Sequence, residues 1–172
     1  TTGYMLFKRF NRSISKTSPG VASQNRPSII FRLADFYLIY AEVANEVNPS
    51  DSRVLTYLNL VRERTGLPKV EILNPGIVGN KELQRAAIQR ERQIELATEG
   101  QRYFDVRRWM IAPQTESKTM HGIEITRATD GTKTWKEFDV RTHVWRPAMY
   151  FFPIPYNETV KSKDLLQNPY YN

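Results

Sequence analysis

The chain has 172 residues, of which 40% are hydrophobic and 12% aromatic, so it is long and apolar enough to bury a core and is not a disordered segment. It contains no cysteine, which excludes disulfides, thiolate metal sites and cysteine nucleophiles. Lysine and arginine outnumber aspartate and glutamate by 25 to 18, and this net charge of +7 raises the question of an anionic partner.

Two helices are predicted in the first half of the chain. Residues 32–47 place apolar side chains at a helical spacing, at Leu33, Phe36, Tyr37, Tyr40, Ala41, Ala44 and Val47. An Asn-Pro pair ends this helix, and a second helix is expected to begin with a cap at Ser50 or Asp51 and to stop at Gly66. Because about three residues join them, the two helices are predicted to form an antiparallel hairpin of the tetratricopeptide type.

A third, long helix and a loop-rich region are predicted to follow. Asn80 is expected to cap a helix that runs to about Met110, which completes a helical core over residues 29–110. In the loop-rich residues 111–172, Asp130-Gly131 indicates a turn, and the β-branched and aromatic residues of 142–155 predict a short β-hairpin. The expected fold class is therefore mainly α, with a small β-hairpin near the C-terminus.

The segment "RERQIELATEGQRYFDVRRW", residues 90–109, mixes acids, arginines and aromatics. Glu91, Glu95 and Glu99 repeat every four residues, and like charges at that spacing disfavour a helix unless cations lie opposite them. The expected cations are Arg102, which Glu95 and Glu99 can reach along the helix, and Arg62 and Arg64 of the second helix. We interpret this segment as a structural ionic clamp that consists of Glu91, Glu95, Glu99, Arg102 and Asp105.

Two other functions compete with this interpretation. Glu91 and Glu95 lie on adjacent helical turns, a separation that also suits the paired carboxylates of a glycoside hydrolase. The arginines at 102, 107 and 108 and the net charge suggest a basic nucleic-acid-binding helical module, but the interleaved acids leave no uniformly positive face. The sequence has no metal-binding histidine spacing, no glycine-rich phosphate loop and no serine nucleophile elbow, so it predicts no catalytic residue, no cofactor and no metal.

Several segments together resemble the C-terminal part of the SusD/RagB family. They are "RLADFYLIYAEVAN", "LNLVRERTGLP", the segment 90–109, and "FFPIPYNE" with "LLQNPYY". The third segment fills the family pattern with Glu91, Arg92, Glu95, Leu96, Glu99, Gly100, Arg102, Asp105, Arg107, Arg108 and Trp109. The sequence departs from the pattern at Val106, which replaces leucine, at Thr98, where an aromatic residue is common, and at Tyr170, where glycine is common.

The resemblance implies a non-catalytic, nutrient-binding lipoprotein of the outer membrane. Family members capture oligosaccharides or other nutrients at the cell surface and pass them to a SusC-like TonB-dependent transporter. The fold is expected to contain tetratricopeptide-like repeats, most of them upstream, so that residues 1–172 form the C-terminal portion and the N-terminal portion is missing. Membrane attachment is expected only through an N-terminal lipid anchor that this chain lacks, and nucleic acid is not an expected partner.

The residues that bind the nutrient need a separate argument. A sugar presents apolar C–H faces and hydroxyls, so its site needs an exposed aromatic platform beside polar groups. Trp135 lies in the polar stretch "GTKTWKEF" and is the first candidate, followed by Tyr170 and Tyr171. Trp109 and Trp145 have core-like neighbours and are expected to be packed.

Overall fold

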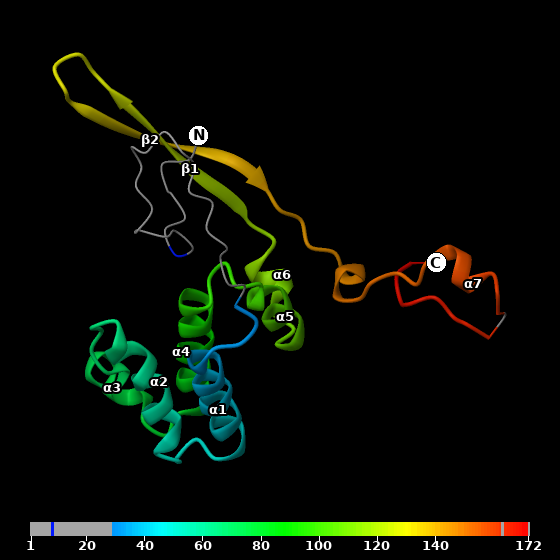
Figure 1. Ribbon diagram of the computed structural model, residues 1–172, viewed down its shortest axis with the longest axis horizontal. Helices are drawn as coiled ribbons and strands as arrows, with labels where there is room; N and C mark the ends of the chain where they lie inside the picture. The colour runs from blue at the N-terminus through cyan, green and yellow to red at the C-terminus, as the bar shows by residue number, and fades with distance from the viewer. Residues whose placement is uncertain (1–7, 9–28, 163, 172) are drawn as a thin grey trace, which may run out of the picture. The chain divides into compact units, whose positions relative to one another are not determined.

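The computed structural model describes residue 8, residues 29–162 and residues 164–171, and Figure 1 labels their helices and strands. The chain divides into two compact units, one within Asn25–Asp105 and the other within Val106–Asn172. The first unit is helical, and the second contains a two-stranded antiparallel sheet and several short helices. The predicted class, mainly α with a helical hairpin and a small β-hairpin, is confirmed.

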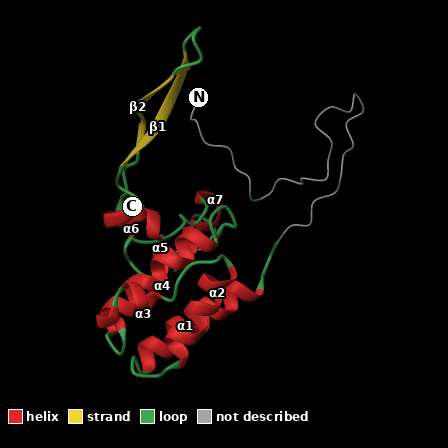
Figure 2. Ribbon diagram, turned by 90° about the vertical axis from the view of Figure 1, so that its left-hand side faces the viewer, coloured by secondary structure: helices red, strands yellow, loops and turns green. Residues whose placement is uncertain are grey.

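Three helices build the core of the first unit. Helices α1 (Leu33–Val47) and α2 (Arg53–Arg64) form the predicted hairpin, and α4 (Lys81–Glu95) packs against both of them (Figures 1 and 2). The fully buried apolar side chains come from all three helices and are Leu38, Ala41, Val54, Leu58, Val61 and Ile88. Burial of this shared face stabilises the unit because each such side chain contributes about 1.5–3 kcal/mol when removed from water.

The end of α2 and the start of α4 follow the sequence signals, whereas the N-cap of α2 is Ser52 and not the predicted Ser50 or Asp51. The Asp51 carboxylate accepts a hydrogen bond of 2.9 Å from the backbone N–H of Arg53, although α2 begins two residues later than that aspartate. Gly66, with φ +78°, adopts the left-handed conformation that ends α2. The Asn80 side chain accepts a 3.1 Å bond from the N–H of Leu83, so the predicted cap of α4 is confirmed.

The apolar stripe predicted for α1 is only partly correct, because Tyr37, Ala41 and Ala44 face the core and its other members do not. Only Ala41 of that stripe is fully buried, whereas Leu33, Phe36, Tyr40 and Val47 are exposed. The face that packs against α2 and α4 instead consists of Asp35, Leu38, Ala41 and Asn45. Helix α1 is therefore apolar on two faces, and the choice between them was made by packing rather than by the periodicity of the helix.

The predicted third helix is interrupted and does not run unbroken to Met110. Helix α4 ends at Glu95, and α5 (Gln101–Arg108) begins after a turn. Thr98 and Gly100 lie in that turn with φ values of +68° and +85°, and neither value is compatible with a right-handed helix. Between α2 and α4, the chain forms the short helices α3 (Val70–Leu73) and η1 (Pro75–Ile77).

The β-hairpin lies upstream of the segment for which it was predicted. Strands β1 (Thr119–Arg127) and β2 (Lys133–Thr142) pair around the turn expected at Asp130-Gly131. Residues 143–155 form irregular structure with one turn of 3₁₀ helix, η2 (Pro147–Tyr150). Three prolines in 142–155 remove backbone donors that a strand needs, which explains why the prediction for this segment was wrong.

Two side chains of β2 lie close to the backbone of β1 at Gly122. An ideal Cβ placed on Gly122 would lie 2.8 Å from Val140 Cγ2 and 2.9 Å from Phe138 Cζ, so these two side chains occupy the space above the glycine. A glycine at position 122 leaves room for these two side chains of β2 to lie against the backbone of β1.

In the described part of the chain, no helix is long and apolar enough to cross a membrane.

A side-chain amide holds the C-terminal segment together. The Gln167 amide accepts a 2.7 Å bond from the N–H of Ile154 and donates a 2.8 Å bond to its carbonyl, which copies one rung of a β-ladder. Prolines flank Ile154 on both sides and supply no N–H, so Gln167 satisfies the backbone donor between them. Asn168 Nδ2 donates to the carbonyl of Phe152, and the Tyr171 hydroxyl donates to the carbonyl of Phe151. These bonds join the residues before the short helix α7 (Tyr156–Thr159) to the residues after it.

Replacing Gln167 with alanine should open this contact locally. The change removes both bonds to Ile154, each with a net value of about 1 kcal/mol. The measurement is hydrogen–deuterium exchange at the Ile154 amide, which should become faster in the variant. Glu158→Gln, which removes only an exposed ion pair with Lys161 in the same segment, should leave that rate unchanged. Equal rates in wild type and Gln167→Ala would contradict this role.

A second local prediction concerns pH. The pKa of Glu46 is lowered from its ordinary 4.5 to about 2. The largest cause is a pair of 2.7 Å hydrogen bonds from Arg85; a bond from Lys81 adds to it, and burial opposes both. A lowered pKa means that Glu46 stabilises the fold above pH 4.5 and that this contribution is lost as the pH falls towards 2. Because the group is partly exposed, its contribution should stay below about 1 kcal/mol. Urea unfolding of Glu46→Gln should therefore differ from wild type at pH 6 and converge with it near pH 2.

Candidate functional site

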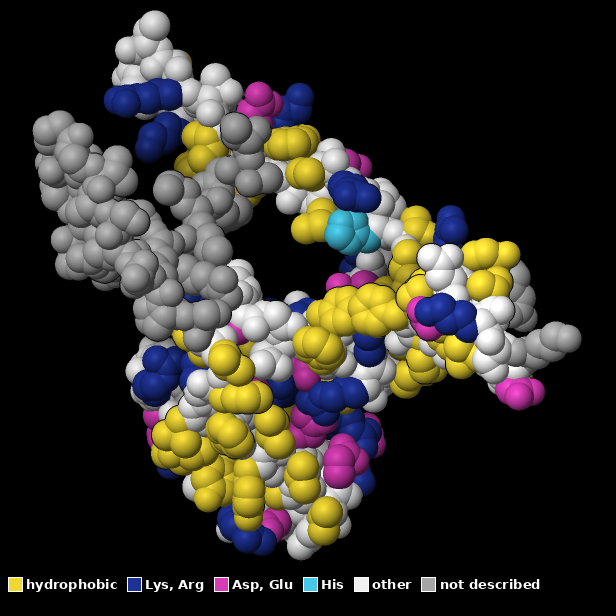
Figure 3. All heavy atoms as spheres, turned by 45° about the vertical axis from the view of Figure 1, so that its right-hand side comes forward, with side chains coloured by type: hydrophobic (Ala, Val, Ile, Leu, Met, Phe, Trp, Pro, Cys, Tyr) yellow, Lys and Arg dark blue, Asp and Glu magenta, His cyan; other side chains and the backbone are white. Residues whose placement is uncertain are grey.

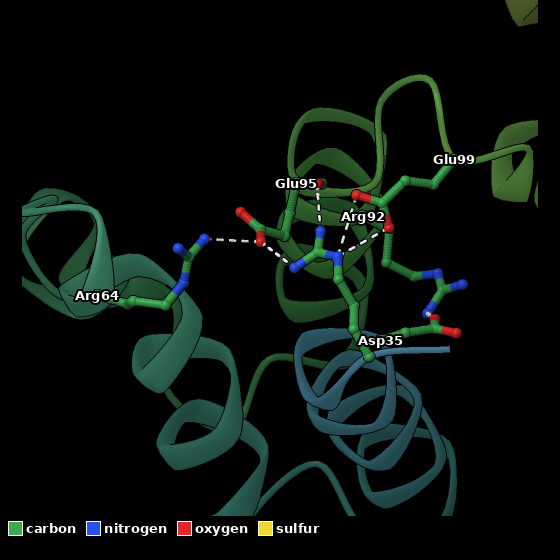
Figure 4. A network of polar contacts seen from close by, with 6 residues as sticks. Asp35, Arg64, Arg92, Glu95 and Glu99 are labelled. Carbon is green, nitrogen blue, oxygen red and sulfur yellow. Dashed lines mark hydrogen bonds and ion pairs between the residues drawn. The ribbon is translucent and has the colours of Figure 1, made fainter. Parts of the chain in front are cut away.

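The innermost part of the predicted clamp centres on Arg92 of α4. Its guanidinium donates to Asp105 of α5 at 2.9 and 3.2 Å. It also donates to Asp35 of α1 at 2.9 Å, as Figure 4 shows. All three side chains are at most 5% exposed. One arginine thus holds three helices together through charged hydrogen bonds in a site with little water, where each bond is strong and each unpaired charge is costly.

A second layer lies around Arg32, the residue just before α1. Arg32 donates to Glu99 at 2.8 and 3.0 Å and to the carboxylate of Glu95 at 2.5 Å, and Arg64 of α2 also reaches Glu95 at 2.7 Å (Figure 4). Burial acts to lower the pKa of the Arg32 guanidinium, but the bonds to Glu99 and Glu95 outweigh it and raise that pKa. Because helix α4 ends at Glu95, the chain turns there, and the carboxylates of Glu95 and Glu99 can both contact the Arg32 guanidinium.

The third contact pairs Glu91 of α4 with Arg62 of α2 at 2.8 Å, and both side chains are largely buried. The two arginines that the sequence placed opposite the acids, Arg62 and Arg64, are therefore their observed partners. Arg102 is half-buried in α5, as part of the same helix that supplies Asp105. The sequence interpretation missed Arg32, Asp35 and Arg92, although an aspartate inside the apolar helix 33–47 is a signal that a buried cation lies opposite it.

This geometry is unlike that of a pair of glycosidase carboxylates. The Glu91 and Glu95 side chains are at most 10% exposed, and guanidinium groups from other helices occupy their oxygens. A substrate needs access to both carboxylates across its scissile bond, and this packing supplies none. In residues 8, 29–162 and 164–171, no group of three or more histidine, aspartate or glutamate side chains is placed to hold a metal ion.

Trp135 lies in a different place, on the second strand of the hairpin. Its side chain is 65% exposed, and in the register of the sheet it lies directly opposite Ile125, which is also exposed. Cross-strand partners share one face of a hairpin, so the two side chains form a small apolar surface that faces solvent. An exposed indole beside an aliphatic side chain has the shape of a sugar-stacking platform.

The two C-terminal tyrosines differ from one another. Tyr170 is 69% exposed and has φ +71°, a conformation that glycine adopts without steric cost, which accounts for the glycine common at this position in the family pattern. Tyr171 is half-buried, and its hydroxyl is engaged with the Phe151 carbonyl at 3.0 Å, so it is a packing residue in this segment. Trp109 and Trp145 are half-buried, as expected, with arginine guanidinium groups 4.6 and 4.8 Å from their rings.

Comparison with known proteins gives a consistent result. The model of the SusD family matches residues 1–171. Two SusD-like proteins of Formosa agariphila are 43% identical over 106 residues, covering 62% of this chain and 19% of the relative, and 30% identical over 144 residues, covering 81% and 25%. The crystal structure of a SusD-like protein from Bacteroides fragilis superimposes with a TM-score of 0.72 at 35% identity, covering 84% of this chain and 26% of that one.

The chain therefore spans about a quarter or less of the length of these relatives. Its matched part contains the ionic clamp of the first unit and the C-terminal contact of Gln167. The family match extends over nearly every residue. The chain belongs to the SusD family.

Proposed function

We propose that the protein binds an oligosaccharide or a similar nutrient at the cell surface, leaves it chemically intact and passes it to a SusC-like TonB-dependent transporter. Membership of the SusD family supports this function. In the whole protein, a lipid anchor at the N-terminus would hold it to the outer membrane with the binding surface outwards. The observation in this chain that carries the proposal is the exposed Trp135–Ile125 surface of the hairpin.

The physical basis of binding is stacking. A pyranose ring offers a flat set of C–H bonds, and an indole face offers a matching apolar surface with a partial negative charge. Such a shallow platform buries little area, so we expect weak to moderate affinity, as suits a protein that has to release its ligand to a transporter. On the same face, two residues along each strand towards the turn, Arg127 and Lys133 supply polar groups for a sugar.

The absence of catalysis is part of the same proposal. The acids with the most suitable spacing, Glu91 and Glu95, are bound by arginines inside the helical unit. Hydrolysis would need two accessible carboxylates that face one sugar ring. The test is direct: the whole protein, incubated with a glycan that it binds, should release no reducing sugar.

Replacing Trp135 with alanine should weaken glycan binding by about tenfold, because a stacked aromatic platform contributes on the order of 1–1.5 kcal/mol beyond simple area. The measurement is isothermal titration calorimetry with a glycan selected on an array. Tyr156→Ala removes another highly exposed aromatic ring of the same unit and should leave the affinity unchanged. Equal losses in both variants would show that Trp135 has no special role.

A further inference from the structure

The face of the hairpin that carries Trp135 is defined by the sheet register. Partners that lie opposite one another point to the same side, and this side alternates from one pair to the next along the ladder. Trp135 and Ile125 form one pair, and the next pair on the same face, towards the turn, is Arg127 with Lys133. Two cations therefore lie beside the apolar platform, between it and the end of the hairpin.

This arrangement is unfavourable for the hairpin by itself. Like charges directly opposite one another destabilise a strand pair, whereas a pair of unlike charges would stabilise it. In the part of the chain that the structure describes, neither Arg127 nor Lys133 forms an ion pair. The Arg127 side chain instead lies over the turn, with Nη2 3.9 Å from the place where a Cβ on Gly131 would be.

The opposite face of the hairpin is built differently. There, Glu124 lies opposite Lys136, and Thr126 lies opposite Thr134, so charge is balanced. The uncompensated positive charge is thus confined to the Trp135 face and does not result from a generally basic hairpin. In Figure 3, lysine and arginine side chains are visible in dark blue at the free end of this ribbon, at the top of the view.

Acidic groups occur at defined places around this face. Farther from the turn, Glu137 and Asp139 share it, and His121 lies 3.5 and 2.9 Å from their carboxylates. At the turn, Asp130 accepts the Thr132 N–H, and that bond lowers its pKa, so it stays ionised. Along the paired strands, this face therefore carries two cations next to the turn, then the apolar pair and then two acids, while Asp130 lies in the turn itself.

We propose that the Trp135 face binds an anionic glycan, with a sugar ring stacked on Trp135 and Ile125 and a sulfate ester or uronate carboxylate held by Arg127 and Lys133. This inference rests on the proposed glycan capture and specifies its ligand class. A guanidinium and an ammonium next to an aromatic ring match a ring that carries both a C–H face and a charged oxygen group. The acids at the far end fix the orientation, because an anion placed there would be repelled.

A single-stranded nucleic acid also combines aromatic stacking with negative charge. Its phosphates recur at every nucleotide, and proteins that bind it use a positively charged groove with several stacking residues. Here one exposed indole and two cations are followed within the same face by two acids. This pattern favours a ligand with one charged group near one stacked ring.

The experiment uses the whole protein and oligosaccharides in matched pairs that differ only in charge. One pair is tetragalacturonate and its fully methyl-esterified form, and the other is a carrageenan tetrasaccharide and its desulfated form. Affinities are measured by calorimetry for wild type, for Arg127→Gln/Lys133→Gln and for Lys136→Gln. The last variant also removes a cation from β2, but from the opposite face, and so controls for net charge. Thermal melting checks that each variant is folded.

We expect the wild type to bind the charged member of at least one pair about tenfold more tightly than the neutral member, the scale of two exposed charge contacts. The double variant should lose this preference, and Lys136→Gln should keep it. The pair that shows the effect tells whether sulfate or carboxylate is recognised.

Three results would overturn the inference. Equal affinity for both members of each pair would refute the charge preference while leaving glycan capture intact. A preference that survives in the double variant would place the anion elsewhere. Tighter binding of an oligothymidine than of any glycan would identify a nucleic-acid surface. If no glycan at all binds, charged or neutral, the proposed capture itself is wrong.

Discussion

Replacing Arg92 with alanine is expected to lower the free energy of unfolding by about 3–5 kcal/mol, because it removes the buried cation that the Asp35 and Asp105 carboxylates share. Asp35 and Asp105 approach the guanidinium from two other helices, and neither is accessible to water that would solvate it after the change. The measurement is urea unfolding at neutral pH, followed by circular dichroism. A loss below 1 kcal/mol would contradict the structural role of this arginine.

Two further variants separate charge from packing. Arg64→Ala removes an arginine whose side chain is 59% exposed, and it should cost less than about 1 kcal/mol. The second variant is the triple substitution Arg92→Met/Asp35→Asn/Asp105→Asn, which removes the cation and both negative charges together. It should be more stable than Arg92→Met alone, since replacing all members of a buried ionic group is often tolerated. No recovery would show that the loss comes from cavity formation rather than from unpaired charge.

Replacing Glu91 with glutamine is expected to destabilise the helical unit by about 1.5–3 kcal/mol. The change removes the negative charge that receives a hydrogen bond from Arg62 across the α2–α4 interface, and bonds to charged groups have net values in this range. The glycoside hydrolase alternative predicts the opposite, because a catalytic carboxylate is held at a cost to stability and its neutralisation usually leaves the fold unchanged or more stable.

The same variant therefore distinguishes two functions by one stability measurement. Reducing-sugar release by the whole wild-type protein, abolished in Glu91→Gln without a change in stability, would establish an enzyme. Lower stability together with unchanged glycan affinity is the result that a structural acid predicts. Glu82→Gln, at an exposed position of the same helix, is the matched control and should alter neither quantity appreciably.

The position of the clamp also bears on how binding and folding are separated in this chain. The residues with the largest expected effect on stability lie within the helical unit, and those with the largest expected effect on ligand affinity lie on the hairpin of the second unit. The family motif of residues 90–109 thus coincides with ion pairs, whereas Trp135, the first candidate ligand residue, lies outside the family motifs. A motif match consequently identifies the fold more firmly than it identifies the ligand.

Local chemistry in the sequence by itself determined the helical hairpin, the cap of α4, the end of α2 and the family, but not the break between α4 and α5. Asn80 and Gly66 act within one or two turns of the backbone, so their effects on α4 and α2 do not depend on distant residues. The exposure of Trp135 could also be predicted, because its neighbours in the chain are polar on both sides. The need for cations opposite the glutamate repeat followed from the spacing of those charges.

Only the tertiary structure decided which cations these are and which face of α1 is buried. Arg32 is 63 and 67 residues from the two glutamates that it binds, a separation that no local pattern encodes. Helix α1 has apolar residues on two faces. The face with Leu38 and Asp35 is the buried one, because Arg92 of another helix compensates the charge of the aspartate. The strands were missed for a similar reason. Both faces of β2 are largely exposed, so it lacks the alternation that a half-buried strand would show, and its pairing with β1 is decided by contacts across the turn.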